Sequence, residues 1–166
     1  MKNKIIFVAC DTSNIKQTKK IINQTQTDKL NIIPKFGLQF FYSKYGRKFL
    51  ESFDKDFWLD LKINDIPQTS LSAIDSLKDL KKCKFITVHA NGGIDMLKAI
   101  KKKTRKINKN LKVLVVTILT SLNSKSLKEI GYNNSVKEIV LKQAGLIKKS
   151  GCDGIVCSAK EAVLIK

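Results

Sequence analysis

The stretch FWLDLKINDIPQT, residues 57–69, contains the change from strand to helix that decides the fold. Its first part, Phe57–Leu61, is a short apolar run, which is typical of a parallel strand buried on both faces. Near its end lies Pro67, and the fixed φ and missing N–H of proline suit the first position of a helix. The stretch therefore predicts a strand, a polar loop and a helix in immediate succession.

Five further apolar runs repeat this pattern along the chain. Each is short and rich in Ile, Val or Phe: Ile5–Cys10, Ile32–Lys35, Phe85–His89, Leu111–Leu119 and Gly154–Cys157. Helical periodicity marks three of the intervening segments, with apolar positions within 74–81, 96–107 and 136–147. This alternation predicts an α/β fold with a parallel sheet. Six strands fit either a shorter α/β sheet or a (β/α)₈ barrel that lacks its last quarter.

The helix boundaries carry capping residues. The segment Asp11–Asn14 opens the first helix and Asn133–Ser135 opens a later one, since their side-chain oxygens can accept hydrogen bonds from free N–H groups. Gly151 is expected to end the helix before the sixth strand, because glycine tolerates the left-handed conformation found there. No G-x-G-x-x-G follows the first strand, which argues against a dinucleotide-binding sheet.

Length and composition indicate one domain over residues 1–166. The chain is 43% hydrophobic, which is enough to bury a core, and it has only 2 prolines and no Gly/Ser-rich linker. The run Ile5–Cys10 is shorter than the ~7–15 apolar residues of a signal peptide. No run approaches the ~18 apolar residues of a transmembrane helix. We therefore expect a cytoplasmic protein with no membrane partner.

The formal net charge of +18, from 32 basic and 14 acidic residues, raises the question of nucleic-acid binding. Nearly all the basic residues are lysines scattered through every segment, and the one modest run is Lys101–Lys103. Many lysines together with many Ile and Asn residues are typical of AT-rich coding. We therefore expect solvated surface lysines and no nucleic-acid partner.

A metal site is not expected either. The cysteines Cys10, Cys83, Cys152 and Cys157 form no C-x-x-C pair, and the single His89 is far from all of them in sequence. Three of the cysteines lie in or beside apolar strand-like runs, and they are interpreted as small buried hydrophobic residues in a reducing compartment.

Charged side chains follow the predicted carboxyl ends of the strands, the edge at which α/β folds place their active sites. Asp60 and Lys62 are two residues apart, so on a strand their side chains project from the same face. Asp65 lies in the following loop, and Lys35 ends the neighbouring strand. We predict an array of two ammonium groups and two carboxylates. The alternative interpretation is an ordinary salt-bridge network at a strand edge.

Such an array suits decarboxylation. A carboxylate that is fixed against a substrate carboxylate repels it, and loss of CO₂ relieves the repulsion. A nearby ammonium group stabilises the carbanion that develops and then donates a proton to it.

Six ordered motifs resemble the orotidine 5′-phosphate decarboxylase family, which catalyses the last step of UMP synthesis. The central motif, DLKINDIPQT at 60–69, resembles the family signature D-x-K-x-x-D-I-P-x-T. The others are VACD at 8–11, PKFG at 34–37, VHANGG at 88–93, VTILTS at 116–121 and GCDGIVCSA at 151–159. The resemblance covers essentially the whole chain. It implies a (β/α)₈ TIM barrel, truncated here to about six β/α units.

The resemblance implies a role for each matching residue. Lys62 is the expected proton donor to C6 of the pyrimidine, and Asp60 is expected to face the departing carboxylate. Lys35 is expected to pair with Asp60 and contact the ribose, and Asp11 to bind a ribose hydroxyl. Thr120 is expected to contact the nucleotide near the base. The implied reaction converts orotidine 5′-phosphate to UMP and CO₂ with no metal or organic cofactor.

The resemblance also implies a homodimer. Asp65, with Ile66 and Thr69, is expected to reach across the dimer interface into the partner's site. His89 is expected to be structural, and Ser158 is expected to cap a helix.

In this family the phosphate is held by loops that follow strands seven and eight, beyond the last strand-like run of this sequence. We therefore expect a C-terminally incomplete domain with impaired activity, because remote phosphate binding assists the chemical step. One alternative is a non-catalytic truncated remnant that binds nucleotide or a partner protein. Another is a sugar-phosphate decarboxylase or aldolase relative, which uses a D-x-K-x-x-D motif to hold magnesium. A basic nucleic-acid-binding protein is suggested only by the net charge.

Overall fold

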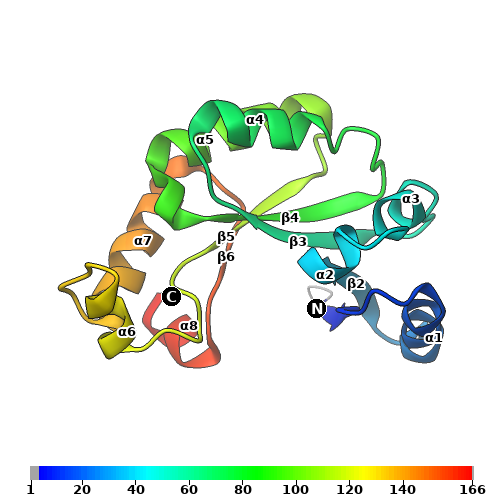
Figure 1. The fold of residues 1–166 in the computed structure, drawn as a ribbon, viewed down its shortest axis with the longest axis horizontal. Coiled ribbons are helices and arrows are strands. Elements are labelled where there is room, and N and C mark those ends of the chain that lie inside the picture. Colours follow the sequence, from blue (N-terminus) through cyan, green and yellow to red (C-terminus); the bar gives the residue numbers. More distant parts are fainter. Residues whose placement is uncertain (1–3, 166) are drawn as a thin grey trace. The chain divides into compact units, whose positions relative to one another are not determined.

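Every strand that the sequence predicts is present in the computed structural model, which describes residues 4–165 (Figure 1). The strands are β1 (Ile5–Ala9), β2 (Asn31–Gly37), β3 (Phe57–Ile63), β4 (Cys83–His89), β5 (Lys112–Val116) and β6 (Gly154–Val156). Hydrogen-bonded neighbours follow the order β1-β2-β3-β4-β5-β6, and the pairs β1–β2, β2–β3 and β5–β6 are parallel. The strand predicted over Leu111–Leu119 is shorter in the structure, where β5 ends at Val116. Ile118 lies beyond the strand but is buried in the core, so the apolar run continues past the last strand residue.

Helices alternate with these strands. They are α1 (Ile15–Thr25), α2 (Leu38–Phe41), α3 (Gly46–Glu51), α4 (Pro67–Asp75), the 3₁₀ turn η1 (Ala90–Gly92), α5 (Gly93–Ile107), α6 (Ser124–Glu129), α7 (Val136–Ser150) and α8 (Ala159–Ile165). The helices α2, α3 and α6 carry no periodic signal in the sequence, because four to six residues are too few to display a helical period.

The predicted capping residues lie at the observed helix ends. The Asn14 side chain accepts hydrogen bonds from the first-turn N–H groups of α1. Ser135 and Glu138 form a reciprocal capping box at the start of α7. Gly151 ends α7 with a φ of +74°, in the left-handed region that glycine tolerates. Ser158 accepts from the Glu161 N–H at the start of α8, so the cap predicted there is also confirmed.

The helix predicted over 74–81 is wrong beyond Asp75. The helix α4 ends at Asp75, and the chain continues through turns in which the Leu80 N–H donates to the Leu77 carbonyl. Both leucines are buried. Their helix-like spacing therefore arises because both side chains are buried from within a turn, and it does not mark a helix.

The chain packs as two compact units. Among the described residues, the first unit comprises 4–61 together with Ser76–Ile86, and the second comprises Lys62–Asp75 together with 87–165. The core of the first unit contains a cluster of phenylalanine rings on β2, β3 and the helices between them, with ring centroids 4.7–6.2 Å apart: Phe36, Phe40, Phe49, Phe53 and Phe57. Rings of this size in edge and stacked contacts stabilise the unit beyond the area they bury.

In the second unit α5 packs against α4 and α7. Lys101 on α5 has a side chain only 8% exposed, and its ammonium group pairs with Asp153. The Asp153 carboxylate also accepts a hydrogen bond of 2.8 Å from the Val113 N–H. This buried ion pair therefore ties α5 to the start of β5 and to the segment before β6.

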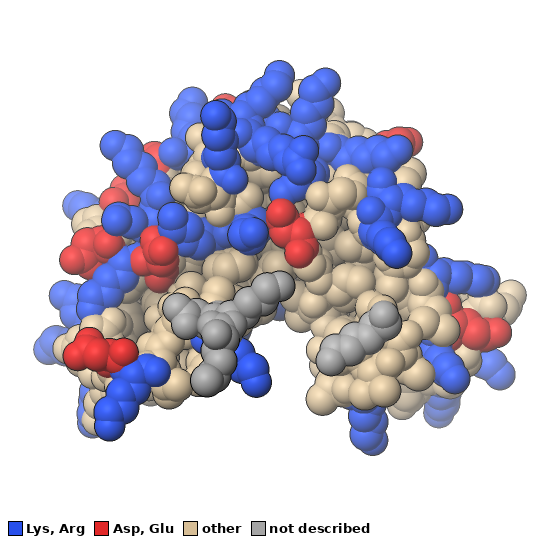
Figure 2. Space-filling model, turned by 180° about the vertical axis from the view of Figure 1, so that it is seen from behind, with Lys and Arg blue, Asp and Glu red and all other residues tan. Residues whose placement is uncertain are grey.

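Basic side chains are spread over the face of the molecule in Figure 2, with acidic ones among them. Some of the lysines are paired, such as Lys103 with Asp75 in the second unit and Lys84 with Asp56 in the first. Across residues 4–165, the structure contains no helix with both the length and the apolar character needed to span a membrane.

Candidate active site

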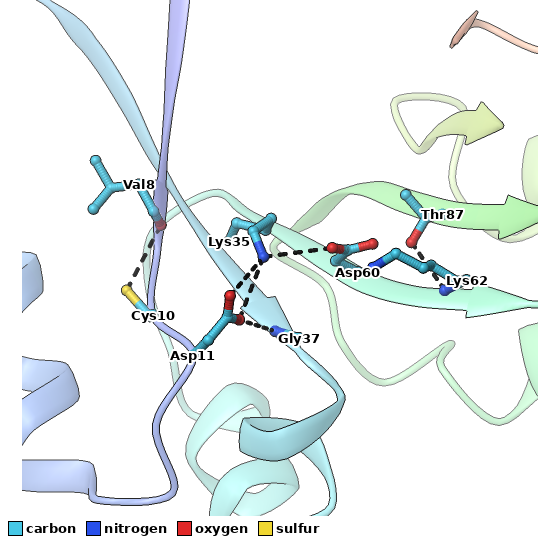
Figure 3. Close-up of polar contacts among 8 residues, drawn as sticks. All are labelled: Val8, Cys10, Asp11, Lys35, Gly37, Asp60, Lys62 and Thr87. Carbon is cyan, nitrogen blue, oxygen red and sulfur yellow. Dashed lines mark hydrogen bonds and ion pairs between the residues drawn. The ribbon is translucent and has the colours of Figure 1, made fainter. Parts of the chain in front are cut away.

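Lys35 is the centre of an ion-paired array in the first unit (Figure 3). Its ammonium nitrogen lies 3.0 Å from Asp11 Oδ2 and 3.4 Å from Asp60 Oδ2. Asp11 follows β1, Lys35 lies on β2 and Asp60 lies on β3. Because these three strands are parallel and adjacent, the side chains at their carboxyl ends meet at one edge.

Gly37 fixes the position of Asp11. Its N–H donates a hydrogen bond of 3.1 Å to Asp11 Oδ1, the oxygen beside the one that binds Lys35 most closely. A Cβ atom at residue 37 would lie only 2.6 Å from Asp11 Oδ1. Glycine is therefore required here for close approach of the carboxylate to the backbone.

Burial is graded across this array. The Asp60 side chain is 10% exposed, that of Lys35 is 18% exposed and that of Asp11 is 47% exposed. Next to them, burial and then the negative charge of Asp11 raise the pKa of the Cys10 thiol to about 11, against the opposing effect of Lys35. The Asp60 carboxylate is thus the one of the two that water screens least, and the Lys35 ammonium group pairs with it.

Lys62 lies in the second unit and has an unusual backbone. Its φ is +50°, and it is the one non-glycine residue with positive φ among residues 4–165. This conformation costs a residue with a Cβ atom about 1–2 kcal/mol. The Lys62 N–H donates a hydrogen bond of 3.0 Å to Oγ1 of Thr87 on β4 (Figure 3). Simple strand alternation therefore does not describe the chain at Lys62.

His89 ends β4 and is nearly buried. Its Nδ1 accepts a hydrogen bond from the Asn91 N–H, and the Asn91 side chain accepts one from Gln143 on α7. Burial, with a smaller contribution from the Lys62 ammonium group, lowers the pKa of His89. These contacts agree with the structural role predicted for the histidine.

The remaining predicted site residues are exposed. Asp65, Ile66 and Thr69 surround the start of α4, and Ile66 is 66% exposed although it is apolar. The Asp65 carboxylate accepts a hydrogen bond from the Ile66 N–H. Thr120 lies in the turn after β5 and is also exposed.

The structure contains the ion pair between Lys35 and Asp60, and it adds Asp11 as a second carboxylate on the same lysine. Lys62 and Asp65 belong to the second unit, so the convergence of all four predicted charges stays a prediction. Sequence reasoning missed the supporting roles of Gly37 and Thr87. The signal available for Thr87 was a polar residue between the apolar Ile86 and Val88 of β4.

Residues 4–165 contain no group of three or more His, Cys, Asp or Glu side chains arranged to hold a metal ion. The charged groups of the array are paired with one another. What the array offers a ligand is therefore direct electrostatic contact and hydrogen bonding.

Comparisons with known proteins agree on one family. The model of the orotidine 5′-phosphate decarboxylase / HUMPS family matches residues 4–166. The orotidine 5′-phosphate decarboxylase of Staphylococcus epidermidis is 42% identical over 135 residues, which are 79% of this chain and 58% of that protein. The enzyme of the same name from Buchnera aphidicola is 37% identical over 164 residues, 97% of this chain and 68% of that protein.

A solved structure supports the same conclusion. Orotidine 5′-phosphate decarboxylase from Lactobacillus acidophilus superposes with a TM-score of 0.81 at 31% identity, covering 96% of this chain and 74% of that one. The fold is thus of the TIM-barrel type, represented here by six β/α units. The match to the Staphylococcus relative spans less than two thirds of that protein's length. From the family match over residues 4–166 and these relatives, the chain belongs to the orotidine 5′-phosphate decarboxylase / HUMPS family.

Proposed function

We propose that this chain is an orotidine 5′-phosphate decarboxylase, which converts orotidine 5′-phosphate to UMP and CO₂. The proposal rests on the array of Asp11, Lys35 and Asp60 at the carboxyl ends of adjacent strands, in a chain whose relatives carry this enzyme's name. A second ammonium group, that of Lys62, follows Asp60 by two residues on β3. In the proposal, the Asp60 carboxylate supplies the repulsion and the Lys62 ammonium group supplies the proton that the reaction needs.

In the proposed mechanism Asp60 faces the substrate carboxylate. Asp60 is only 7% exposed, so water screens its charge poorly. Bringing a second carboxylate against it is unfavourable, and departure of neutral CO₂ removes the repulsion. The interaction therefore favours the transition state over the bound substrate.

Lys62 is the proposed proton donor. The bond between C6 and the carboxylate carbon breaks, the electron pair remains on C6, and CO₂ leaves. The Lys62 ammonium group then transfers one proton to C6, and the resulting neutral amine regains a proton from solvent. Asp11 and Lys35 are proposed to hold ribose hydroxyls, and Thr120 to contact the base.

The experiment follows the loss of orotidine 5′-phosphate absorbance with purified protein, with and without EDTA. We expect turnover that EDTA does not change, a loss of at least about 100-fold in Lys62→Ala, and no loss in the control Lys98→Ala, which removes an exposed lysine from α5. Turnover in Lys62→Ala equal to that of the unchanged protein would contradict the proposal. Magnesium-dependent activity on a sugar phosphate would instead favour the alternative of a sugar-phosphate decarboxylase or aldolase relative.

A second candidate is a non-catalytic form that binds nucleotide or a partner protein. The observation in its favour is that the charges of Asp11, Lys35 and Asp60 are paired with one another, as in an ordinary salt-bridge network. A folded sample that binds UMP in calorimetry but shows no turnover at high protein concentration would support this candidate over the enzyme.

We also propose that the chain forms a homodimer through the start of α4. The exposure of the apolar Ile66, beside Asp65 and Thr69, supports this proposal. Light scattering should give a dimer, and Ile66→Asp should give a monomer. If Asp65 serves the partner's site, a mixture of Lys62→Ala and Asp65→Ala proteins should recover activity that neither has alone. A monomer at micromolar concentration would contradict the proposal.

A further inference from the structure

Lys62 adopts a conformation that its own side chain disfavours. Its φ of +50° lies in the left-handed region, where a Cβ atom crowds the following carbonyl oxygen. Such a residue persists only when its surroundings compensate the strain. The contacts of Lys62 with its surroundings must therefore stabilise its positive φ.

Thr87 supplies one such contact from within the second unit. Its hydroxyl oxygen accepts the Lys62 N–H at 3.0 Å, and the residue is fully buried. A β-branched side chain has a stiff χ1 angle, so the position of this oxygen is set by the backbone of β4. No solvent reaches the hydroxyl to compete for the hydrogen bond.

Removal of this acceptor would leave the Lys62 N–H without its buried partner. The chain could then relax to ordinary strand geometry, in which successive side chains point to opposite faces. Such a relaxation would re-aim the Lys62 side chain without touching its ammonium group. The hydroxyl of Thr87 is thus placed to control the direction of the Lys62 side chain through the hydrogen bond that it accepts from the Lys62 backbone.

From this geometry we infer that Thr87 is a positioning residue, whose hydroxyl holds Lys62 in the left-handed conformation and so aims its ammonium group. The inference deepens the proposed function, because it rests on Lys62 as the proton donor. Thr87 itself takes no part in proton transfer.

The test compares Thr87→Val, which keeps the shape and removes the hydroxyl, with Thr87→Ser, which keeps the hydroxyl. The matched control is Thr18→Val on α1, because Thr18 is equally buried and its hydroxyl has no hydrogen-bond partner among residues 4–165. The first measurement is amide hydrogen exchange at Lys62 by NMR. We expect exchange about 10-fold faster in Thr87→Val, near the unchanged rate in Thr87→Ser, and unchanged in Thr18→Val.

The second measurement is turnover of orotidine 5′-phosphate. We expect Thr87→Val to lower kcat by about 10- to 100-fold with little change in KM, and Thr87→Ser to restore it. Unchanged exchange at Lys62, or equal losses in kcat for Thr87→Val and Thr18→Val, would overturn the inference. If the unchanged protein has no turnover, the proposed function fails, and the exchange rates alone still decide whether Thr87 holds Lys62.

Discussion

Replacement of Gly37 by alanine should separate the stability of the fold from the function of the site. The φ of Gly37 is −91° and its ψ is −171°, which alanine adopts without strain. The added Cβ atom would lie 2.6 Å from Asp11 Oδ1, so the carboxylate has to move by several tenths of an ångström. The movement breaks the hydrogen bond from the Gly37 N–H and disturbs the ion pair with Lys35.

The expected magnitudes follow from exposure. A hydrogen bond to a charged group contributes about 1.5–3 kcal/mol to stability when buried, but the Asp11 side chain is 47% exposed and water replaces part of the loss. Replacement of glycine by alanine stabilises the folded state by about 0.4–1 kcal/mol, because alanine lowers the conformational entropy of the unfolded chain. The free energy of unfolding should therefore change by less than about 1 kcal/mol. If Asp11 holds a ribose hydroxyl as proposed, its displacement should weaken UMP binding by about 10- to 100-fold.

Urea unfolding followed by circular dichroism measures the first quantity, and titration calorimetry with UMP measures the second. Gly145→Ala on α7 is the matched control, because a Cβ atom there meets nothing within 4 Å. That variant should be slightly more stable and should bind UMP normally. A folded Gly37→Ala protein with undiminished UMP binding would refute the reasoning. A loss in the free energy of unfolding above about 3 kcal/mol would also refute it, because it would mean that the backbone, and not the Asp11 carboxylate, had moved to relieve the clash.

Three further outcomes are expected. Lys101→Met should lower the free energy of unfolding by about 1–3 kcal/mol in urea titrations, because it removes the ammonium partner of Asp153, whose side chain is 21% exposed and keeps its hydrogen bond from the Val113 N–H; no measurable loss would show that the pair contributes little. Lys62→Met should raise the pKa of His89 toward the ordinary range by removing a positive charge, and this is measurable by NMR because the chain has one histidine; a fall in the pKa would contradict it. Burial raises the pKa of Cys83 to about 12, so iodoacetamide at pH 8 should modify Cys83 only after unfolding; rapid labelling of the folded protein would count against the packing described.

The sequence predicted those features that depend on local chemistry. Pro67, Ser135 and Gly151 lie at helix ends because each satisfies a backbone requirement within a few residues of itself. The strands were predictable because continuous apolar runs identify segments that are buried on both faces. The turns after Asp75 were not, since burial of Leu77 and Leu80 imitates a helical period.

The site was predictable only as far as its strand ends. Asp60 and Lys35 were expected to meet because parallel strands bring their carboxyl ends to one edge, and they do. The contact between Gly37 and Asp11 joins residues 26 apart, and that between Lys62 and Thr87 joins residues 25 apart. Neither contact could be predicted from nearby residues, because both depend on the distance between neighbouring strands, and the second depends also on the positive φ of Lys62.

The chain contains one tryptophan, Trp58, and its position gives the first unit an optical label. Trp58 is 8% exposed, and its ring centroid lies 4.6 Å from that of Phe7. Its emission therefore reports the packing of β1 against β3. Because the chain has one tryptophan, the second unit contributes no tryptophan emission. Emission and far-ultraviolet ellipticity recorded on the same sample will coincide if the two units melt together, and will diverge if one unit melts before the other.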